Sequence, residues 1–350
     1  SFMKALLLAG GLGTRLRPLT DDLPKPMVPI MGRPLLESII LNLKKSGIDE
    51  VVISTYYKSQ YIEDYFRQKE DLGVKIHYIT EESPLGTGGA IKNAEKFFDD
   101  TFLILNSDIV SDVNYADLIK YHKRRRAQVT IASIEVRDTS QYGVIEFDEK
   151  GFITAFKEKP KSGESNSKYI NAGVYVFEPD VLKEIPENTV VSVERETYPT
   201  LLEKGYRMAI YKFNGYWIDI GTIDKYKKVH EDILRGKSRF ISTNFSRGII
   251  LGDNVKIHPT ARVIGPAYIG NNTEIDAYAT VGPYTVIGNN CRIGQESKVS
   301  KSILWNNVKV RRFARLDNAV VTSECIVEVN MEIKNTVFTA NRLASSTMTT

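Results

Sequence analysis

The feature of this 350-residue sequence that most restricts its fold is a period of six residues in its last third. Small side chains (Ala, Thr, Cys or Ser) lie two positions before seven of the eight repeated residues, and Gly directly follows four of them. This pattern predicts a coil of three short strands per turn, with one aliphatic side chain inside each strand and small residues near the corners. The repeated aliphatic positions are Ile257, Val263, Ile269, Ile275, Val281, Ile287, Ile293 and Val299.

The repeat resembles the hexapeptide repeat of the left-handed parallel β-helix. We expect this domain to span residues 249–338, with one or two irregular coils after Val299, where the register slips. The Ser/Thr-rich residues 339–350 are predicted to form a disordered tail. Because the repeated positions are apolar and small, the β-helix is expected to provide subunit contacts or regulation, and a homo-oligomer is predicted.

The first part of the chain has a different hydrophobic pattern, in which short apolar runs alternate with segments of helical periodicity. Strands are predicted at residues 4–9, 51–55, 74–79 and 102–105, and helices at 34–46 and 224–234. This alternation predicts an α/β domain with a Rossmann-like, doubly wound and mostly parallel sheet. We expect that domain to cover residues 3–235, with residues 236–248 as the linker to the β-helix.

Composition excludes several other classes of protein. The formal net charge is only +4, which does not favour a nucleic-acid partner. No apolar run approaches the roughly 18–20 residues needed to span a bilayer. Two cysteines, Cys291 and Cys325, exclude a disulfide framework and favour the reducing cytoplasm.

A glycine-rich loop directly follows the first predicted strand. Gly10, Gly11 and Gly13 would let backbone N–H groups approach an anion at the carboxyl end of a strand. Arg15 and Lys25 add positive charge, and prolines on both sides of Lys25 restrict the direction of its side chain. The loop completes neither a dinucleotide-binding fingerprint nor a Walker loop.

Six motifs in order resemble the signature of the sugar-1-phosphate nucleotidyltransferases, and most closely their mannose-1-phosphate guanylyltransferase branch. They are Gly-Gly-Leu-Gly-Thr-Arg-Leu-Arg-Pro-Leu-Thr with Pro-Lys-Pro (10–26), Pro-Leu-Gly-Thr-Gly-Gly-Ala (84–90), Asn-Ser-Asp (106–108), Phe-Lys-Glu-Lys-Pro (156–160), Asn-Ala-Gly-Val-Tyr (171–175) and Trp-Ile-Asp-Ile-Gly-Thr (217–222). The resemblance implies that a sugar 1-phosphate attacks the α-phosphorus of a nucleoside triphosphate and that pyrophosphate leaves. The attacking phosphate is already mostly dianionic at pH 7, so the reaction needs cations and alignment more than a general base.

By this resemblance Asp108 and Asp219 would hold Mg²⁺, which prefers oxygen ligands. Arg15 and Lys25 would bind the triphosphate, and Lys159 would bind the sugar phosphate. These five residues are the predicted catalytic set. The nucleotide would contact Leu8, Ala9, Gly10, Gly11, Gly13, Thr14, Arg15, Lys25, Glu81, Pro84, Gly86, Thr87 and Asp108. The sugar phosphate would contact Gly143, Glu158, Lys159, Asn171, Gly173 and Asp219.

Glu81 precedes the loop in which the family reads the base. A carboxylate there would accept hydrogen bonds from guanine N1–H and from the 2-amino group, which favours GTP. The alternative is that Glu81 or its neighbour Glu82 merely faces water. We therefore predict GTP and mannose 1-phosphate as substrates, with glucose 1-phosphate or heptose 1-phosphate and another triphosphate as the alternative. A catalytically silent homologue that senses a nucleotide sugar is a second alternative, and a β-helix acyltransferase is disfavoured by the short array of coils.

Overall fold

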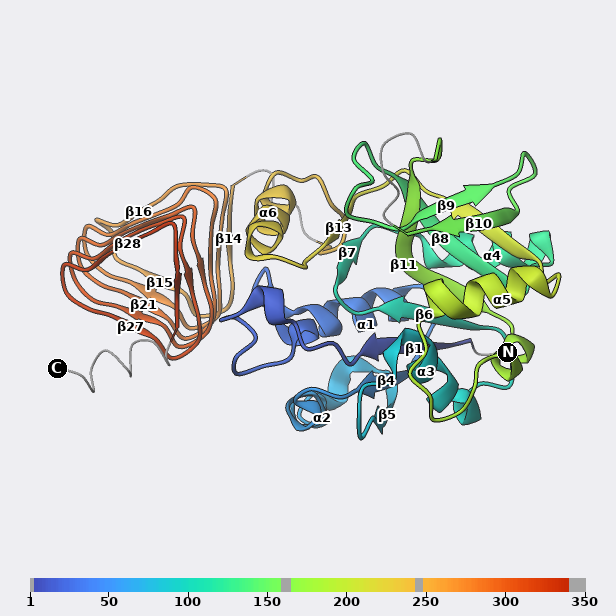
Figure 1. Ribbon diagram of the computed structural model, residues 1–350. Coiled ribbons are helices and arrows are strands. Elements are labelled where there is room, and N and C mark those ends of the chain that lie inside the picture. The colour runs from blue at the N-terminus through green and yellow to red at the C-terminus, as the bar shows by residue number, and fades with distance from the viewer. Residues whose placement is uncertain (1–2, 159–164, 243–247, 340–350) are drawn as a thin grey trace. The chain divides into compact units, whose positions relative to one another are not determined.

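The computed structural model describes residues 3–158, 165–242 and 248–339 (Figure 1). Its contacts divide the chain into two compact units. The N-terminal unit contains residues 1–12 and 36–219, and the C-terminal unit contains residues 13–35 and 220–350. The segment 13–35, which carries Arg15 and Lys25, therefore packs with the C-terminal part of the chain.

One large sheet forms the core of the N-terminal unit. Its strands are β1 (Lys4–Ala9), β4 (Glu50–Thr55), β5 (Lys75–Thr80), β6 (Phe102–Asn106), β8 (Val129–Glu135), β9 (Val144–Phe147), β10 (Ile153–Lys157), β11 (Tyr169–Phe177) and β12 (Met208–Lys212). They are ordered β10-β9-β11-β6-β1-β4-β5, with β8 beside β11 and β12 beside β8. Strands β6, β1, β4 and β5 are parallel, which confirms the predicted doubly wound arrangement, whereas β11 runs antiparallel to β6.

Short connections and helices surround this sheet. They are α1 (Leu35–Lys45), α2 (Ser59–Arg67), η3 (Glu70–Leu72), α3 (Gly86–Asn93), η4 (Glu95–Phe97), α4 (Tyr115–Arg125), η5 (Pro179–Glu184), η6 (Val193–Thr197) and α5 (Tyr198–Glu203). Helix α1 shows why they form: Leu36, Ile39, Ile40 and Leu43 recur at helical spacing and all are buried. The helix ends at Lys45, and Gly47, whose φ is 87°, allows the chain to turn just beyond it.

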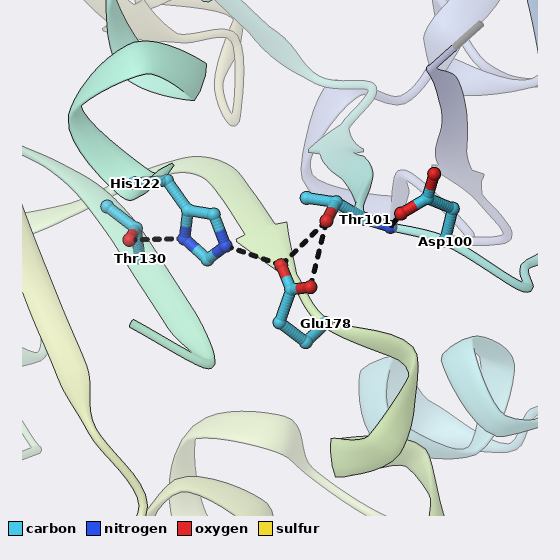
Figure 2. A network of polar contacts seen from close by, with 5 residues as sticks. All are labelled: Asp100, Thr101, His122, Thr130 and Glu178. Atoms are coloured by element: carbon cyan, nitrogen blue, oxygen red, sulfur yellow. Dashed lines mark hydrogen bonds and ion pairs between the residues drawn. The ribbon is translucent and has the colours of Figure 1, made fainter. Parts of the chain in front are cut away.

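A polar network lies at the amino end of β6, at the opposite end of that strand from Asp108 (Figure 2). The buried His122 ring is 2.6 Å from Thr130 Oγ1 and 2.7 Å from Glu178 Oε2, and the Thr101 hydroxyl donates to the same carboxylate at 2.8 Å. Thr130 is fully buried, so we assign this network a structural role. Burial would raise the pKa of Glu178, but the hydrogen bonds from His122 and Thr101 outweigh it, and the pKa lies below its usual range.

Glu178→Gln is expected to lower the free energy of unfolding by about 1 kcal/mol at pH 7, because the amide cannot replace both charge-assisted hydrogen bonds. The lowered pKa means that this contribution is present above the unfolded value of roughly 4.3 and is lost as the pH falls through the folded value. Urea titrations at pH 7 and at acid pH measure the difference, with Glu187→Gln at an exposed position as the control. If Glu178→Gln lowered the free energy of unfolding equally at both pH values, the charge of Glu178 would not be the source of the stabilisation.

The C-terminal unit begins with the segment 13–35 and helix α6 (Ile223–Leu234). The segment contains η1 (Thr14–Leu16), η2 (Lys25–Met27) and the hairpin strands β2 (Pro29–Ile30) and β3 (Arg33–Pro34). Helix α6 starts where the Thr222 side chain accepts a hydrogen bond from the backbone N–H of Lys225. Its buried face carries Tyr226, Val229, His230 and Ile233 at helical spacing.

The remainder of this unit is a β-helix whose coils are seen in Figure 1 as stacked triangles. Its strands form three parallel sheets, β14-β17-β20-β23-β26-β29, β15-β18-β21-β24-β27 and β16-β19-β22-β25-β28. The repeated aliphatic residues from Ile269 to Val299 form its buried core, as predicted. The strands are β14 (Ile249–Leu251), β15 (Lys256–Ile257), β16 (Arg262–Val263), β17 (Ala267–Ile269), β18 (Glu274–Ile275), β19 (Thr280–Val281), β20 (Thr285–Ile287), β21 (Arg292–Ile293), β22 (Lys298–Ser300), β23 (Ile303–Leu304), β24 (Lys309–Val310), β25 (Arg315–Asp317), β26 (Val320–Val321), β27 (Ile326–Val327), β28 (Glu332–Lys334) and β29 (Val337–Phe338).

The prediction of irregular coils after Val299 is wrong. Equivalent residues on successive coils are 18 apart in the first coils and 17 apart afterwards. Ile269 pairs with Ile287, and Ile287 then pairs with Leu304. One residue is missing from each later coil at the corner before β23, β26 and β29, so the six-residue register slips although the coils remain regular.

Two further expectations concern the ends of the chain and membranes. Most of the predicted tail, residues 340–350, lies outside the described residues, as do residues 243–247 of the predicted linker. In the part of the chain that the structure describes, no helix combines the length and the apolar character needed to cross a bilayer.

Candidate active site

The carboxyl ends of β1 and β5 bring together part of the predicted nucleotide site. Leu8 and Ala9 end β1, and Gly10 and Gly11 follow that strand directly. A Cβ atom added at Gly10 would lie 3.8 Å from Glu81 Oε2, so the glycine and this carboxylate are neighbours. A Cβ atom at Gly11 would have nothing within 4 Å, which leaves the backbone there open to a ligand.

Glu81 points inward, whereas Glu82 is exposed. Only 7% of Glu81 is exposed, and its Oε2 accepts a hydrogen bond from the backbone N–H of Leu85 at 3.3 Å. Burial raises the pKa of this carboxyl. Of the two neighbouring acids it is therefore Glu82 that faces water.

The glycines that follow Glu81 have a packing role that the sequence did not reveal. The sequence predicts a loop after Glu81, whereas Gly86, Gly88 and Gly89 form the first turn of α3 (Gly86–Asn93). A Cβ atom on Gly86 would lie 2.5 Å from Val191 O and one on Gly88 would lie 2.8 Å from Val191 Cγ1, so the chain at Val191 can approach only glycine. Thr87 reinforces this contact, because its Oγ1 accepts the backbone N–H of Val193 at 3.0 Å. Pro84 is exposed just before this turn.

The structure places Asp108 and Asp219 at the same end of two paired strands. Asp108 directly precedes β7 (Ile109–Ser111), and Asp219 ends β13 (Trp217–Asp219). These strands pair antiparallel with Asp219 opposite Ile109, so the two carboxylates lie at the same end of one ladder. The Tyr142 hydroxyl donates to Asp219 Oδ1 at 3.1 Å.

A glycine with a positive φ supports this ladder from β11. Gly173 has a φ of 78°, and a Cβ atom there would lie only 2.2 Å from Ile109 Cδ1. Gly173 therefore allows β11 to pass close to the residue beside Asp108. Trp217 fixes the other strand of the ladder, because its Nε1–H donates to Ala172 O at 2.9 Å.

A pocket of about 570 Å³ within the N-terminal unit contains several of the residues predicted to bind the sugar. Gly143, Glu158 and Asn171 line it, together with Thr87 and two residues that the sequence analysis missed, Glu194 and Arg195. Its other lining residues are Val144, Ile145, Phe156, Lys157, Ser192 and Pro199.

Hydrogen bonds orient the polar groups of this pocket. Asn171 Nδ2 donates to Glu194 Oε1 at 2.9 Å and to the Tyr175 hydroxyl at 2.5 Å, while its Oδ1 accepts the Gly173 N–H at 2.8 Å. Burial raises the pKa of Glu194, and the hydrogen bond from Asn171 only partly opposes this. At the rim, Arg195 Nη2 is 2.6 Å from Glu158 Oε1.

Glu194 lies in η6, a single turn of π-helix, a conformation that is frequent at functional sites. Glu194 lies among charged residues, Glu194-Arg195-Glu196, and no sequence pattern distinguishes the half-buried acid from the exposed one. The only signal was the apolar pair Val193 and Tyr198, which frames the charged run.

The remaining predicted site residues are Gly13, Thr14, Arg15 and Lys25, which belong to the C-terminal unit, and Lys159. A Cβ atom on Gly13, whose φ is 65°, would lie 3.0 Å from the Lys25 Cβ atom, so these two residues are neighbours. Thr14 and Arg15 form the exposed start of η1. Lys159 lies outside the described residues.

No group of three or more His, Cys, Asp or Glu side chains able to hold a metal occurs among residues 3–158, 165–242 and 248–339. Asp108 and Asp219 supply two carboxylates, which is fewer than the three side chains of such a group. Two carboxylates with substrate phosphates are a typical environment for Mg²⁺, so the residues present fit this ion.

Comparisons with known proteins relate both parts of the chain to described families. Residues 4–236 match the Nucleotidyl transferase family, and residues 246–345 match the EIF2B subunit epsilon LbH domain. The second match agrees with a left-handed β-helix.

Individual proteins extend these matches. Mannose-1-phosphate guanylyltransferase of Mycobacterium tuberculosis is 39% identical over 77% of this chain and 76% of its own length. UTP–glucose-1-phosphate uridylyltransferase of Synechocystis is 32% identical over 93% of this chain and 88% of its own. The crystal structure of HddC from Yersinia pseudotuberculosis, complexed with GMP-PN, covers 66% of this chain and 100% of its own, with 31% identity and a TM-score of 0.58.

Proposed function

This chain belongs to the nucleotidyl transferase family, and we propose that it transfers GMP from GTP to mannose 1-phosphate to give GDP-mannose and pyrophosphate. The observation that carries the reaction class is that Asp108, directly before β7, and Asp219, at the end of β13, lie at the same end of one ladder. The observation that supports GTP is the buried carboxylate of Glu81 beside Gly10. The name of the mycobacterial relative supports the same pair of substrates.

In the proposed reaction an oxygen of the sugar phosphate forms a bond to the α-phosphorus, and the bond from that phosphorus to the leaving pyrophosphate breaks. The second pKa of a phosphate monoester is about 6, so the nucleophile is already ionised and no side chain has to remove a proton. The four histidines agree with this, because each has a hydrogen-bond partner outside the site: Glu50 for His77, Glu178 for His122, Tyr226 for His230 and Thr260 for His258.

The chain's own residues would bind and align the two anions. Asp108 and Asp219 would hold Mg²⁺, which when bound neutralises charge on the phosphate oxygens. Arg15 and Lys25 would bind the triphosphate, and Lys159 the sugar phosphate. In the pocket, Glu194 and Asn171 would bind sugar hydroxyls, with Glu158 held at the rim by Arg195.

A pyrophosphate-release assay of four nucleoside triphosphates against a panel of sugar 1-phosphates tests this proposal. We expect GTP with mannose 1-phosphate to give the highest kcat/KM. A preference for UTP with glucose 1-phosphate would favour the second candidate, which the uridylyltransferase supports because it matches 93% of this chain. Absence of release from every pair would indicate a silent nucleotide-sugar sensor.

Glu81→Gln is expected to reduce the preference for GTP over UTP about 10-fold, because one amide oxygen replaces the carboxylate that would accept from two guanine donors. The ratio of kcat/KM for the two triphosphates measures the effect. Glu82→Gln is the matched control, since this adjacent side chain is exposed and should leave the ratio unchanged. An unchanged ratio in Glu81→Gln would mean that Glu81 does not read the base.

We also propose that the protein is a cytoplasmic homo-oligomer whose subunits associate through the β-helix or the catalytic domain. Exposed apolar side chains on the coils, including Leu251 (48% exposed) and Tyr278 (61% exposed), support an association through the β-helix. Light scattering of the full chain measures the state directly, and a monomer at all concentrations would contradict the proposal.

A further inference from the structure

A buried tyrosine on α6 connects the β-helix to the segment that carries Lys25. The Tyr226 hydroxyl donates a hydrogen bond to the backbone carbonyl of Pro29. The same oxygen accepts the Nε1–H of Trp305, which follows β23, at 3.1 Å. Tyr226 is fully buried and Trp305 is 5% exposed, so the bond between them lies in a region that excludes water.

His230, one turn further along α6, holds the same segment at a second point. Its Nδ1 lies 2.9 Å from Tyr226 O and donates to that carbonyl, which leaves Nε2 to accept the Met31 N–H at 3.1 Å. Burial lowers the pKa of His230 to about 4, so the ring is neutral at pH 7 and retains this acceptor. Tyr226, through Pro29 O, and His230, through the Met31 N–H, thus both bond to backbone atoms of the hairpin β2–β3.

The hairpin turn itself has a conformation that needs support. Met31 has a φ of 53° and Gly32 has a φ of 78°, a pair of positive values that L-residues rarely adopt at the first position. A Cβ atom at Gly32 would lie 3.0 Å from Cε1 of Tyr268, so a second coil of the β-helix covers the turn. The β-helix therefore contacts the hairpin directly through Tyr268. It also contacts the hairpin indirectly, because Trp305 bonds to Tyr226 of α6, which in turn bonds to Pro29.

Only a short and rigid stretch separates the hairpin from Lys25. The backbone N–H of Val28 donates to Lys25 O at 3.2 Å, and the N–H of Leu35 donates to Val28 O at 3.0 Å. Pro24 and Pro26 restrict the backbone on both sides of Lys25. These bonds and prolines would therefore transmit a shift of the hairpin to the backbone of Lys25.

We propose that Tyr226, Trp305 and His230 are positioning residues through which the β-helix holds the hairpin β2–β3 and thereby places Lys25. This rests on the proposed function, because it takes Lys25 to bind the triphosphate. The segment contains only three-residue helices and two-residue strands, so it has little secondary structure to hold it by itself. The β-helix would accordingly take part in nucleotide binding by way of Lys25.

Tyr226→Phe tests the proposal, because it removes one hydroxyl and keeps the ring. We expect hydrogen exchange of the backbone amides in residues 25–34 to become about 10-fold faster, since a buried bridge between two groups is lost. In the pyrophosphate-release assay, kcat/KM for the triphosphate should fall about 10-fold, while KM for the sugar phosphate stays constant. A loss of stability alone would not produce this split between the two substrates.

Trp305→Phe is the second variant, and its effects should have the same direction and be smaller. The double variant should be no worse than Tyr226→Phe alone, because both changes act through one hydroxyl. Lys227→Met is the matched control: Lys227 Nζ bonds to Asn318 O at 3.2 Å and so links α6 to the β-helix without reaching the hairpin. It should alter neither the exchange nor the kinetic split.

The exchange measurement separates failure of this inference from failure of the proposed function. If the wild type releases no pyrophosphate but exchange in residues 25–34 still rises in Tyr226→Phe and not in Lys227→Met, the proposed function fails and the support of the hairpin stands. Unchanged exchange in both Tyr226→Phe and Trp305→Phe overturns the inference. An equal rise in KM for both substrates also overturns it.

Discussion

Asp108→Asn is expected to lower kcat for pyrophosphate release by about 10³-fold, roughly 4 kcal/mol of transition-state stabilisation, with the fold intact. The amide has nearly the same shape as the carboxylate, so the pairing of β7 with β13 should persist. The substitution removes the negative charge of Asp108, one of the two carboxylates at the end of the β7–β13 ladder. Because phosphoryl transfer depends on neutralising and aligning anions, loss of a metal ligand affects the rate more than substrate binding.

Asp219→Asn should have an effect of similar size, and the double variant should be little worse than either single variant, since in the proposed function both residues would serve one ion. Asp112→Asn is the control, because Asp112 lies just beyond the other end of the same ladder. Titration of Mg²⁺ should show a higher concentration for half-maximal rate in both site variants. Appreciable activity of Asp108→Asn at saturating Mg²⁺ would contradict the metal assignment.

The fold was predictable where the sequence carries a local period. Residues 5–9 of β1 are a continuous apolar run, as expected of a strand buried on both faces of a sheet, and this pattern is readable without any long-range information. The six-residue repeat is equally local, since each strand contributes one inward side chain. The later coils were misjudged because a deletion of one residue per coil shifts the pattern without changing the structure.

The contacts of the segment 13–35 could not be predicted in the same way. Met31 and His230, which bond to each other, are 199 residues apart in sequence, and nothing in either residue's neighbourhood indicates its partner. His230 is on the apolar face of an amphipathic helix, where a buried histidine is usually structural. The functional motifs identified Lys25 but not the residues that hold it.

In the candidate pocket, too, residues that belong to sequence motifs were predictable, whereas a residue defined only by its three-dimensional surroundings was not. Asn171 and Glu158 belong to recognisable motifs, so both were predicted. Glu194 belongs to none of the six motifs, and its surroundings depend on the packing of η6 near α3, where Val191 contacts the α3 glycines. A carboxylate in a charged run becomes distinctive only when its surroundings are known.

Glu194→Gln is expected to raise KM for the sugar phosphate about 30-fold and to leave KM for the triphosphate unchanged. Asn171 Nδ2 holds Glu194 Oε1 at 2.9 Å, and a Cβ atom on Gly143 would lie 3.5 Å from Oε2, so the second oxygen is beside the Gly143 wall of the pocket. A carboxylate in this place accepts hydrogen bonds from sugar hydroxyls, whereas an amide has one acceptor and one donor. Glu196→Gln is the control on the same turn, because Gln can replace Glu in its bond to the Ser192 N–H.

The pH dependence gives a second readout for Glu194. Its raised pKa means that the charged acceptor is lost as the pH falls through a value above that of an ordinary glutamate. The sugar phosphate also titrates near pH 6, but that change is common to wild type and variant and cancels in the ratio of their KM values. The ratio should therefore be largest at alkaline pH and should fall toward unity as the pH falls through the pKa of Glu194. A ratio that does not depend on pH would show that the charge of Glu194 has no part in binding the sugar.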